Sequence, residues 1–176
     1  IAKLGDPAIR NSLVERGDDW QVLLETYTDA VNAVVAGIPA GMAVGIHLCR
    51  GNKAGHWQAD GGYDDVAESL FRKLHLGFYF LEYDSPRAGS FEPLRALPDD
   101  KVVVVGAMTT KSSKLETAEF LKSRIQEAAK IVDLNRLCIS PQCGFSSSVE
   151  GVMSEEQEHA KLARLIEVAN DIWGNS

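Results

Sequence analysis

The sequence has few cysteines and no long apolar run, and these two absences limit what the chain can be. It contains three cysteines in 176 residues. This odd and sparse count argues against a disulfide framework and for a reducing, cytoplasmic environment. No apolar run approaches the roughly 20 residues that span a bilayer, and no signal peptide is visible. We therefore expect a cytoplasmic protein that does not enter a membrane.

Basic residues are also in the minority. The chain has 18 Lys and Arg against 25 Asp and Glu, which gives a net charge of −7. This balance argues against a general nucleic-acid or anionic-membrane surface. A hydrophobic content of 45% is ordinary for a globular protein, and 176 residues fit one domain with a substantial core. Because the first residue is Ile1 rather than Met, we expect a mature fragment or a trimmed chain.

Helical and strand patterns alternate along the chain. Apolar residues at helical spacing predict helices over residues 18–36, 64–74, 114–131 and 154–173. Short apolar runs predict strands over residues 43–49, 78–82, 101–106 and 137–140. This alternation predicts an α/β fold with a parallel sheet covered by helices. Four strands fit either a small open sheet or half of an eight-stranded barrel, and the pattern does not separate the two.

Side chains suited to bind a metal follow three of the four predicted strands. His47 and Cys49 end the first strand one residue apart, and alternate strand residues lie on the same face. Glu82 ends the second strand, and Cys143 follows the fourth. In parallel α/β folds, functional groups gather at the carboxyl ends of the strands. One imidazole, two thiolates and one carboxylate suit a tetrahedral Zn²⁺ ion.

Each of these residues also has a plainer interpretation. A lone histidine on a strand is more often a hydrogen-bonded core residue, and a cysteine is often a small buried hydrophobe. We expect this second role for Cys138, which lies inside the fourth strand. Glu82 is more informative, because an acid that ends an apolar strand is costly to bury unless a cation or a donor meets it. The coincidence of four such residues at equivalent strand ends favours a metal site.

Further polar residues follow the same strand ends. Arg50 and Asn52 come after the first strand, where they are expected to support the site or the loop, and Asn52 is also expected to contact substrate. Asp84 and Arg87 come after the second strand, where they could contact substrate or form a local ion pair. Thr109, Thr110 and Lys111 follow the third strand, where they could meet an anionic tail.

Three motifs resemble those of a known family. They are Ile-His-Leu-Cys-Arg-Gly-Asn, ending at Asn52; Leu-Glu-Tyr-Asp, ending at Asp84; and Ser-Pro-Gln-Cys-Gly-Phe, ending at Phe145. They resemble the catalytic domain of cobalamin-independent methionine synthase, and most closely its short single-domain relatives, from about Ile1 to Trp173. The resemblance implies a (β/α)8 TIM barrel with zinc at its carboxyl-terminal mouth. Residues 1–176 would supply about the last four β/α units, the C-terminal half of that barrel.

The resemblance also implies a chemistry. The family's zinc ligands match His47, Cys49, Glu82 and Cys143. The implied reaction is transfer of a methyl group from a methyltetrahydrofolate-like donor to a homocysteine-like thiol, which forms methionine. A related branch of the fold opens epoxides with a thiol, so another zinc–thiolate alkyl transfer is an alternative. A non-catalytic, structural zinc fragment is a further alternative.

Two departures from the family pattern concern the substrates. After the matched acid, the long two-domain enzymes carry a Ser-Arg-Ser type segment, whereas Tyr-Asp-Ser follows here, as in the short relatives. The acid that holds the substrate amine is expected just before Ile1, although Asp6-Pro7 superficially resembles its motif. The partners of this chain would then be a small thiol, a methyl donor, and either the missing N-terminal half of the barrel or a second copy.

Overall fold

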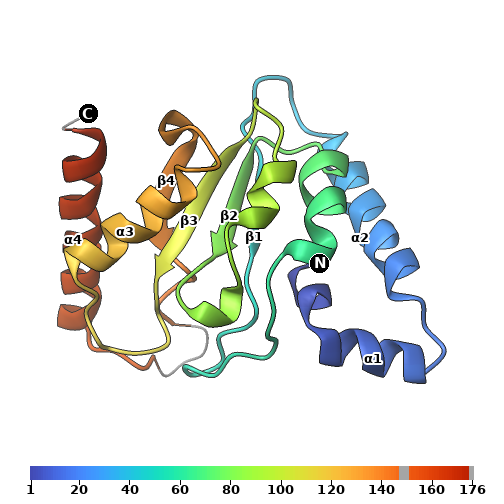
Figure 1. Cartoon of the computed structure of the whole chain (residues 1–176), viewed down its shortest axis with the longest axis horizontal. Helices are drawn as coiled ribbons and strands as arrows, with labels where there is room; N and C mark the ends of the chain where they lie inside the picture. Colours follow the sequence, from blue (N-terminus) through green and yellow to red (C-terminus); the bar gives the residue numbers. More distant parts are fainter. Residues whose placement is uncertain (147–150, 175–176) are drawn as a thin grey trace.

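The chain folds around one parallel β-sheet (Figure 1). The computed structural model describes residues 1–146 and 151–174. Its strands are β1 (Gly45–Leu48), β2 (Phe78–Glu82), β3 (Val102–Met108) and β4 (Leu137–Pro141), in the order β1-β2-β3-β4. All three pairings are parallel, which confirms the predicted α/β class. Within the described residues β1 and β4 each have one neighbouring strand, so this sheet is open rather than closed into a barrel.

Four α-helices accompany the sheet. They are α1 (Pro7–Glu15), α2 (Trp20–Val35), α3 (Ala118–Ala128) and α4 (Glu155–Trp173). The predicted helix at 64–74 is present with mixed winding, as a 3₁₀ turn η2 (Asp64–Val66) followed by a π-helical segment η3 (Ser69–Lys73). Further 3₁₀ turns are η1 (Ala2–Gly5), η4 (Pro86–Ala88), η5 (Glu92–Ala96) and η6 (Leu134–Arg136). None of the helices in the described part is both long and apolar enough to cross a bilayer.

Helix α1 was not predicted, although its start carries a recognisable signal. The Asp6 carboxylate accepts a hydrogen bond from the Ala8 N–H at 2.8 Å, and Pro7 occupies the first helical position. An aspartate cap followed by proline is a favoured helix start. The other oxygen of Asp6 accepts from the Asp60 N–H at 2.8 Å. Asp6 therefore fixes the N-terminal segment to the loop after β1.

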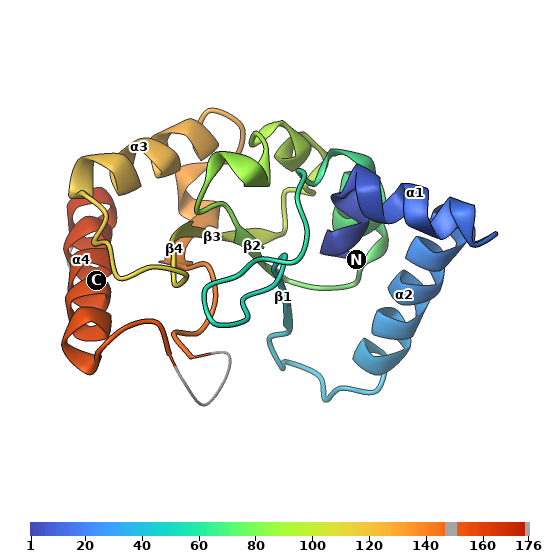
Figure 2. The same ribbon diagram turned by 90° about the horizontal axis from the view of Figure 1, so that it is seen from below.

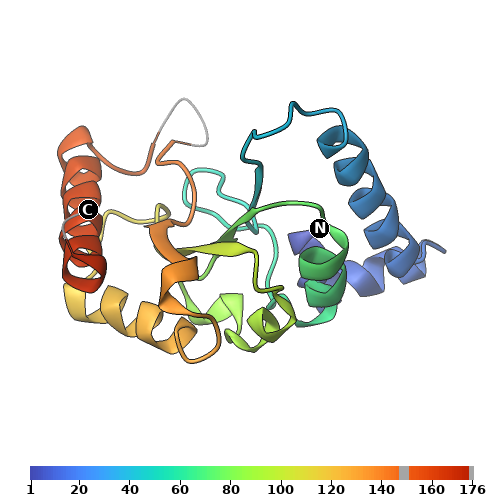
Figure 3. The same cartoon turned by 90° about the horizontal axis from the view of Figure 1, so that it is seen from above.

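In the part of the chain that the structure describes, helices cover one face of the sheet and leave the other uncovered (Figures 2 and 3). On the covered face, the aligned side chains of Tyr79, Val103 and Leu137 are buried. The next residues along the strands point the other way and form the aligned row His47, Phe80, Val104 and Cys138. Phe80 is 40% exposed there, and Cys138 is also exposed. The prediction that Cys138 lies in the core is therefore wrong, because its face of the sheet has no helical cover.

Only part of the apolar face of α2 is buried against other elements. Leu24 is buried, but Tyr27 is 43% and Val34 is 75% exposed. Helix α2 packs on α1 and η3 and stands off the free edge of β1. Its remaining apolar side chains therefore line the open space beside that edge.

Helix α4 begins with a reciprocal cap that can be tested. The Ser154 hydroxyl accepts from the Gln157 N–H at 3.4 Å, and the Gln157 side chain accepts from the Ser154 N–H at 2.9 Å. Replacing Ser154 with alanine removes one acceptor from the first turn, and we expect a loss of about 1 kcal/mol in unfolding free energy. Urea unfolding of the two chains measures this loss. An Ser154→Ala chain as stable as the parent would contradict the capping assignment.

Candidate metal centre

Three of the four predicted ligands meet at the carboxyl edge of the sheet. The Cys143 Sγ and the His47 Nε2 lie 3.3 Å apart. The ligand atoms of His47, Cys49 and Cys143 all lie within 4.8 Å of one another. Tetrahedral zinc, with bonds of about 2.0–2.3 Å, holds its ligand atoms roughly 3.5–4 Å apart. Two sulfurs and one imidazole at this spacing fit a Zn²⁺ ion with small adjustments.

The three residues come from opposite edges of the sheet. His47 lies on β1, Cys49 is the first residue after β1, and Cys143 follows β4 by two residues. The segment after β4 approaches because Gly106 of β3 has no side chain: a Cβ there would lie 2.8 Å from the Gln142 Cα. The chain thus reaches back over β3 towards β1. The curvature of the sheet and this close approach together bring His47, Cys49 and Cys143 into one group.

Hydrogen bonds among the three side chains shift their proton equilibria. The hydrogen bond from Cys143, helped by the one with His47, lowers the pKa of Cys49 to about 4. The same bond and burial raise the pKa of Cys143. The hydrogen bond with Cys49 raises the pKa of His47. Cys49 is therefore the thiolate and Cys143 its proton donor, and a divalent cation would remove the repulsion that keeps Cys143 protonated.

This shift predicts a distinctive cysteine reactivity in the metal-free chain. Cys49 should be alkylated by iodoacetamide at a nearly constant rate from about pH 5 to about pH 8, because its thiol is already ionised above its pKa. Burial raises the pKa of Cys138, so its rate should rise roughly tenfold per pH unit over the same range. Peptide mass spectrometry at timed quenching separates the two sites. A Cys49 rate that climbs with pH as steeply as that of Cys138 would contradict the assignment.

Glu82, the fourth predicted ligand, is not a member of this three-residue group and is held by other partners. Its side chain is fully buried. One carboxylate oxygen accepts from the Arg50 N–H at 2.6 Å; the other accepts from the Arg87 guanidinium and, at 3.1 Å, from the Lys111 ammonium. Burial opposes ionisation of Glu82, but these three donors outweigh it and lower the pKa of the carboxyl. The structure thus places the fourth predicted ligand, ionised, in a cationic cradle formed by Arg87 and Lys111.

A buried tyrosine joins the strand ends beneath this cradle. The Tyr63 hydroxyl donates to the Leu48 carbonyl at 3.0 Å and accepts from the Glu82 N–H at 2.9 Å. The fully buried guanidinium of Arg50 lies over the Tyr63 ring, 4.2 Å from its centroid, and donates to the Glu82 carbonyl at 3.2 Å. Tyr63 was not selected from the sequence, whereas Arg50 was expected to support either the site or the loop, and its contacts with Glu82 agree with the first of these. Their role depends on contacts between strands that no local pattern encodes.

The residues predicted to bind substrate take part in internal contacts. Asn52 donates to the Thr110 hydroxyl at 2.9 Å, which joins the segments that follow β1 and β3. Asp84 accepts from Lys111 at 3.2 Å and lies 3.8 Å from Arg87, so it belongs to an ion-pair cluster. Arg87 also donates to the Ala59 carbonyl at 3.0 Å. These contacts agree with the local ion pair and the loop support that the sequence left open, and substrate contact stays a prediction.

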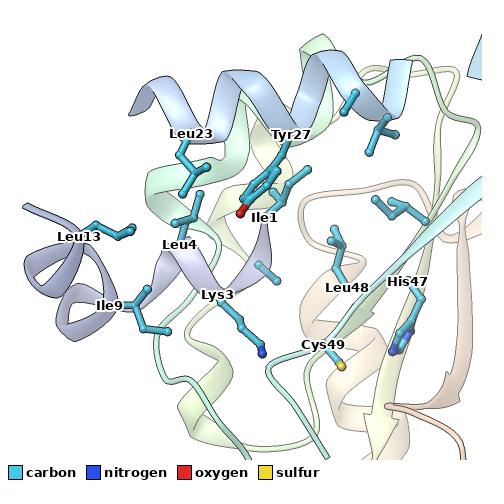
Figure 4. Close-up of a pocket in the computed structure, with 14 residues that line it drawn as sticks. Ile1, Lys3, Leu4, Ile9, Leu13, Leu23, Tyr27, His47, Leu48 and Cys49 are labelled. Atoms are coloured by element: carbon cyan, nitrogen blue, oxygen red, sulfur yellow. The ribbon is translucent and has the colours of Figure 1, made fainter. Parts of the chain in front are cut away.

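An apolar cavity of about 640 Å³ lies beside the metal group (Figure 4). It lies between the N-terminal segment, α2 and β1 and is open to solvent, with Leu4, Leu23 and Tyr27 among its walls. His47 and Cys49 line one end, so the group has direct access to this space.

The comparison with protein families decides the relationship. The profile of the cobalamin-independent synthase catalytic domain matches residues 1–170. The chain belongs to this family. Among curated relatives, the uncharacterized protein YxjH of Bacillus subtilis (strain 168) is 45% identical over 159 residues, covering 89% of this chain and 42% of YxjH. The 5-methyltetrahydropteroyltriglutamate–homocysteine methyltransferase of Bacillus licheniformis is 20% identical over 174 residues, covering 99% of this chain and 21% of that enzyme.

Solved structures of the cobalamin-independent synthases agree with the fold. A Listeria monocytogenes protein, described as a candidate vitamin-B12 independent methionine synthase, has a TM-score of 0.64 and 36% identity. That match covers 87% of this chain and 42% of the Listeria chain. A B12-independent methionine synthase from Shewanella sp. W3-18-1, in complex with selenomethionine, has a TM-score of 0.68 at 22% identity, over 82% and 42% of the two chains. The chain therefore spans about two fifths of the length of these proteins.

Proposed function

We propose that this chain carries the zinc-binding part of a cobalamin-independent methyltransferase that acts on a thiol, with homocysteine as acceptor and a methyltetrahydrofolate as donor. In this proposal the chain is the C-terminal half of a (β/α)8 barrel. The observation that carries the proposal is the convergence of His47, Cys49 and Cys143 within 4.8 Å at the carboxyl edge of the sheet. Family membership and the adjoining cavity support it.

The chemistry needs an ionised thiol at neutral pH. A free thiol has a pKa near about 8.5, so little of it is thiolate at neutral pH. Bound zinc would supply the positive charge that keeps a substrate sulfur deprotonated and nucleophilic. His47, Cys49 and Cys143 would hold the ion as permanent ligands, and we assign Glu82 as the exchangeable fourth ligand.

The protein side chains also set the charge of the site. Two thiolates, one carboxylate and a neutral imidazole would hold a divalent ion, so the loaded site would be electron-rich and would acidify bound water only weakly. Such a site favours a sulfur nucleophile over bound hydroxide, in contrast to zinc sites built from histidines alone. The cavity beside His47 and Cys49 is lined largely by apolar side chains, so one side of the reacting sulfur would face apolar groups.

Zinc-edge X-ray absorption of the zinc-loaded chain tests this function. We expect two sulfur ligands in the resting chain and three after addition of L-homocysteine, with L-homoserine, its oxygen analogue, leaving the count at two. A chain that retains no zinc after dialysis would refute the metal site. Zinc held with an unchanged sulfur count would indicate a structural ion and refute the thiol chemistry.

A further inference from the structure

The cradle around Glu82 balances charge away from solvent. It contains two carboxylates, Glu82 and Asp84, and two cations, Arg87 and Lys111, and each of the four side chains is at most 10% exposed. Lys111 bridges the acids, at 3.1 Å from Glu82 and 3.2 Å from Asp84. Burial makes each ion depend on its partners, because an uncompensated buried charge is strongly unfavourable.

This balance opposes any move of Glu82 towards the three metal-binding side chains. If the Glu82 carboxylate left, Arg87 and Lys111 would keep only Asp84 as an acidic partner. The carboxylate would also lose the hydrogen bond that it accepts from the Arg50 N–H at 2.6 Å. Cations that stay beside a carboxylate also weaken its donation to another positive ion, since they compete for the same lone pairs.

We propose that Lys111 and Arg87 are positioning residues that compete with the bound metal for the Glu82 carboxylate and so make Glu82 the weakest ligand. This inference rests on the proposed function, since it concerns the same ion. The cradle receives Glu82 when the ligand is displaced, so the carboxylate is never left buried without partners. The competition sets how readily the fourth position becomes free for a substrate sulfur.

Lys111 is the member that can be changed with least damage. Arg87 also donates to the Ala59 carbonyl and lies 5.0 Å from the centroid of the Trp57 ring, so its loss would disturb the loop after β1. The ammonium of Lys111 contacts the two carboxylates. With glutamine at 111, Glu82 keeps its contacts with Arg87 and the Arg50 N–H, and the chain should fold.

The test is zinc affinity, measured by competition with a chromophoric chelator on the 176-residue chain. We expect Lys111→Gln to bind zinc about tenfold more tightly than the parent, a change of the size seen when residues around metal ligands are altered. Lys111→Arg keeps the charge and should stay within about twofold of the parent. Lys114→Gln removes a nearby exposed positive charge and should also stay within about twofold.

A double variant separates positioning from simple charge repulsion. Glutamine at position 82 keeps an acceptor oxygen for the cradle donors but is a poor metal ligand. In the Glu82→Gln background, adding Lys111→Gln should change zinc affinity by less than about threefold. A tenfold gain that persists there would mean that Lys111 repels the ion through space, and the proposal would be wrong.

The outcomes also separate this inference from the function on which it rests. If the parent chain fails to bind zinc, the proposed function fails with it. If the parent binds zinc and Lys111→Gln has the parent's affinity, only the positioning role is refuted. A Lys111→Arg chain that behaves like Lys111→Gln would likewise refute it, because the charge pairing would not be the cause.

Discussion

Replacement of Cys143 with alanine is expected to lower the zinc affinity of the chain by at least about 100-fold. The reason is geometric: Cys143 is the only member of the described ligand group that follows β4, and without it the ion keeps His47, Cys49 and the exchangeable Glu82. Loss of a residue that only supports a ligand already weakens metal binding by about 10–100-fold, so loss of a ligand should exceed that range. Chelator competition measures the affinity.

Cys138→Ala is the matched control for this experiment. This substitution also removes one thiol from the region of β4. Cys138, however, lies within β4 on the open face of the sheet, outside the ligand group. We expect its zinc affinity to stay within about twofold of the parent. Equal losses in the two variants would indicate adventitious thiol binding, and equal retention would place the ion elsewhere.

Removal of the Tyr63 hydroxyl is expected to destabilise the chain by about 2–4 kcal/mol. In Tyr63→Phe the Leu48 carbonyl and the Glu82 N–H both lose a partner in a fully buried position, and each such group costs about 1–3 kcal/mol. The aromatic ring and its packing against Tyr83 remain, so the loss reports the hydroxyl. Urea unfolding followed by circular dichroism gives the difference in unfolding free energy.

Tyr27→Phe provides the comparison for the tyrosine hydroxyl. Tyr27 is 43% exposed on α2, where water can replace any lost hydrogen bond, and we expect a change within about 0.5 kcal/mol. If Tyr63→Phe is no more destabilising than Tyr27→Phe, the Tyr63 hydroxyl does not join the ends of β1 and β2 in solution.

The sequence predicted the strands better than the helices. The prediction for β2 agrees residue for residue with Phe78–Glu82, because this aromatic run follows a glycine and is too short for an ordinary helix. Helix α1 was missed because Asp6-Pro7 was compared with a functional motif rather than interpreted as a cap followed by the first helical residue. The exposure of Val34 was also missed, because periodicity shows which side of a helix is apolar but not whether another element covers it.

The residues of the candidate site could also be predicted only in part. His47 and Cys49 could be paired from the two-residue period of a strand, and Cys143 from its position after a parallel strand. The partners of Glu82 could not be anticipated, because Lys111 is 29 residues away in sequence and reaches Glu82 only in the folded chain. Arg50 could be selected from its position after the first strand, but Tyr63 acts through contacts across strand ends, for which the sequence has no local signal.

The origin of the ligands on opposite edges has a mechanical consequence for the sheet. His47 and Cys143 are 96 residues apart in sequence. His47 lies on β1 and Cys143 follows β4, and β2 and β3 lie between these two strands. An ion shared between them would act as a cross-link that holds the two margins of the sheet in a curved arrangement. Because the entropy of loop closure grows with loop length, such a link restricts the unfolded chain more than a local site would. Binding of the metal would then favour the curved sheet, and a sheet already curved would bind the metal more tightly.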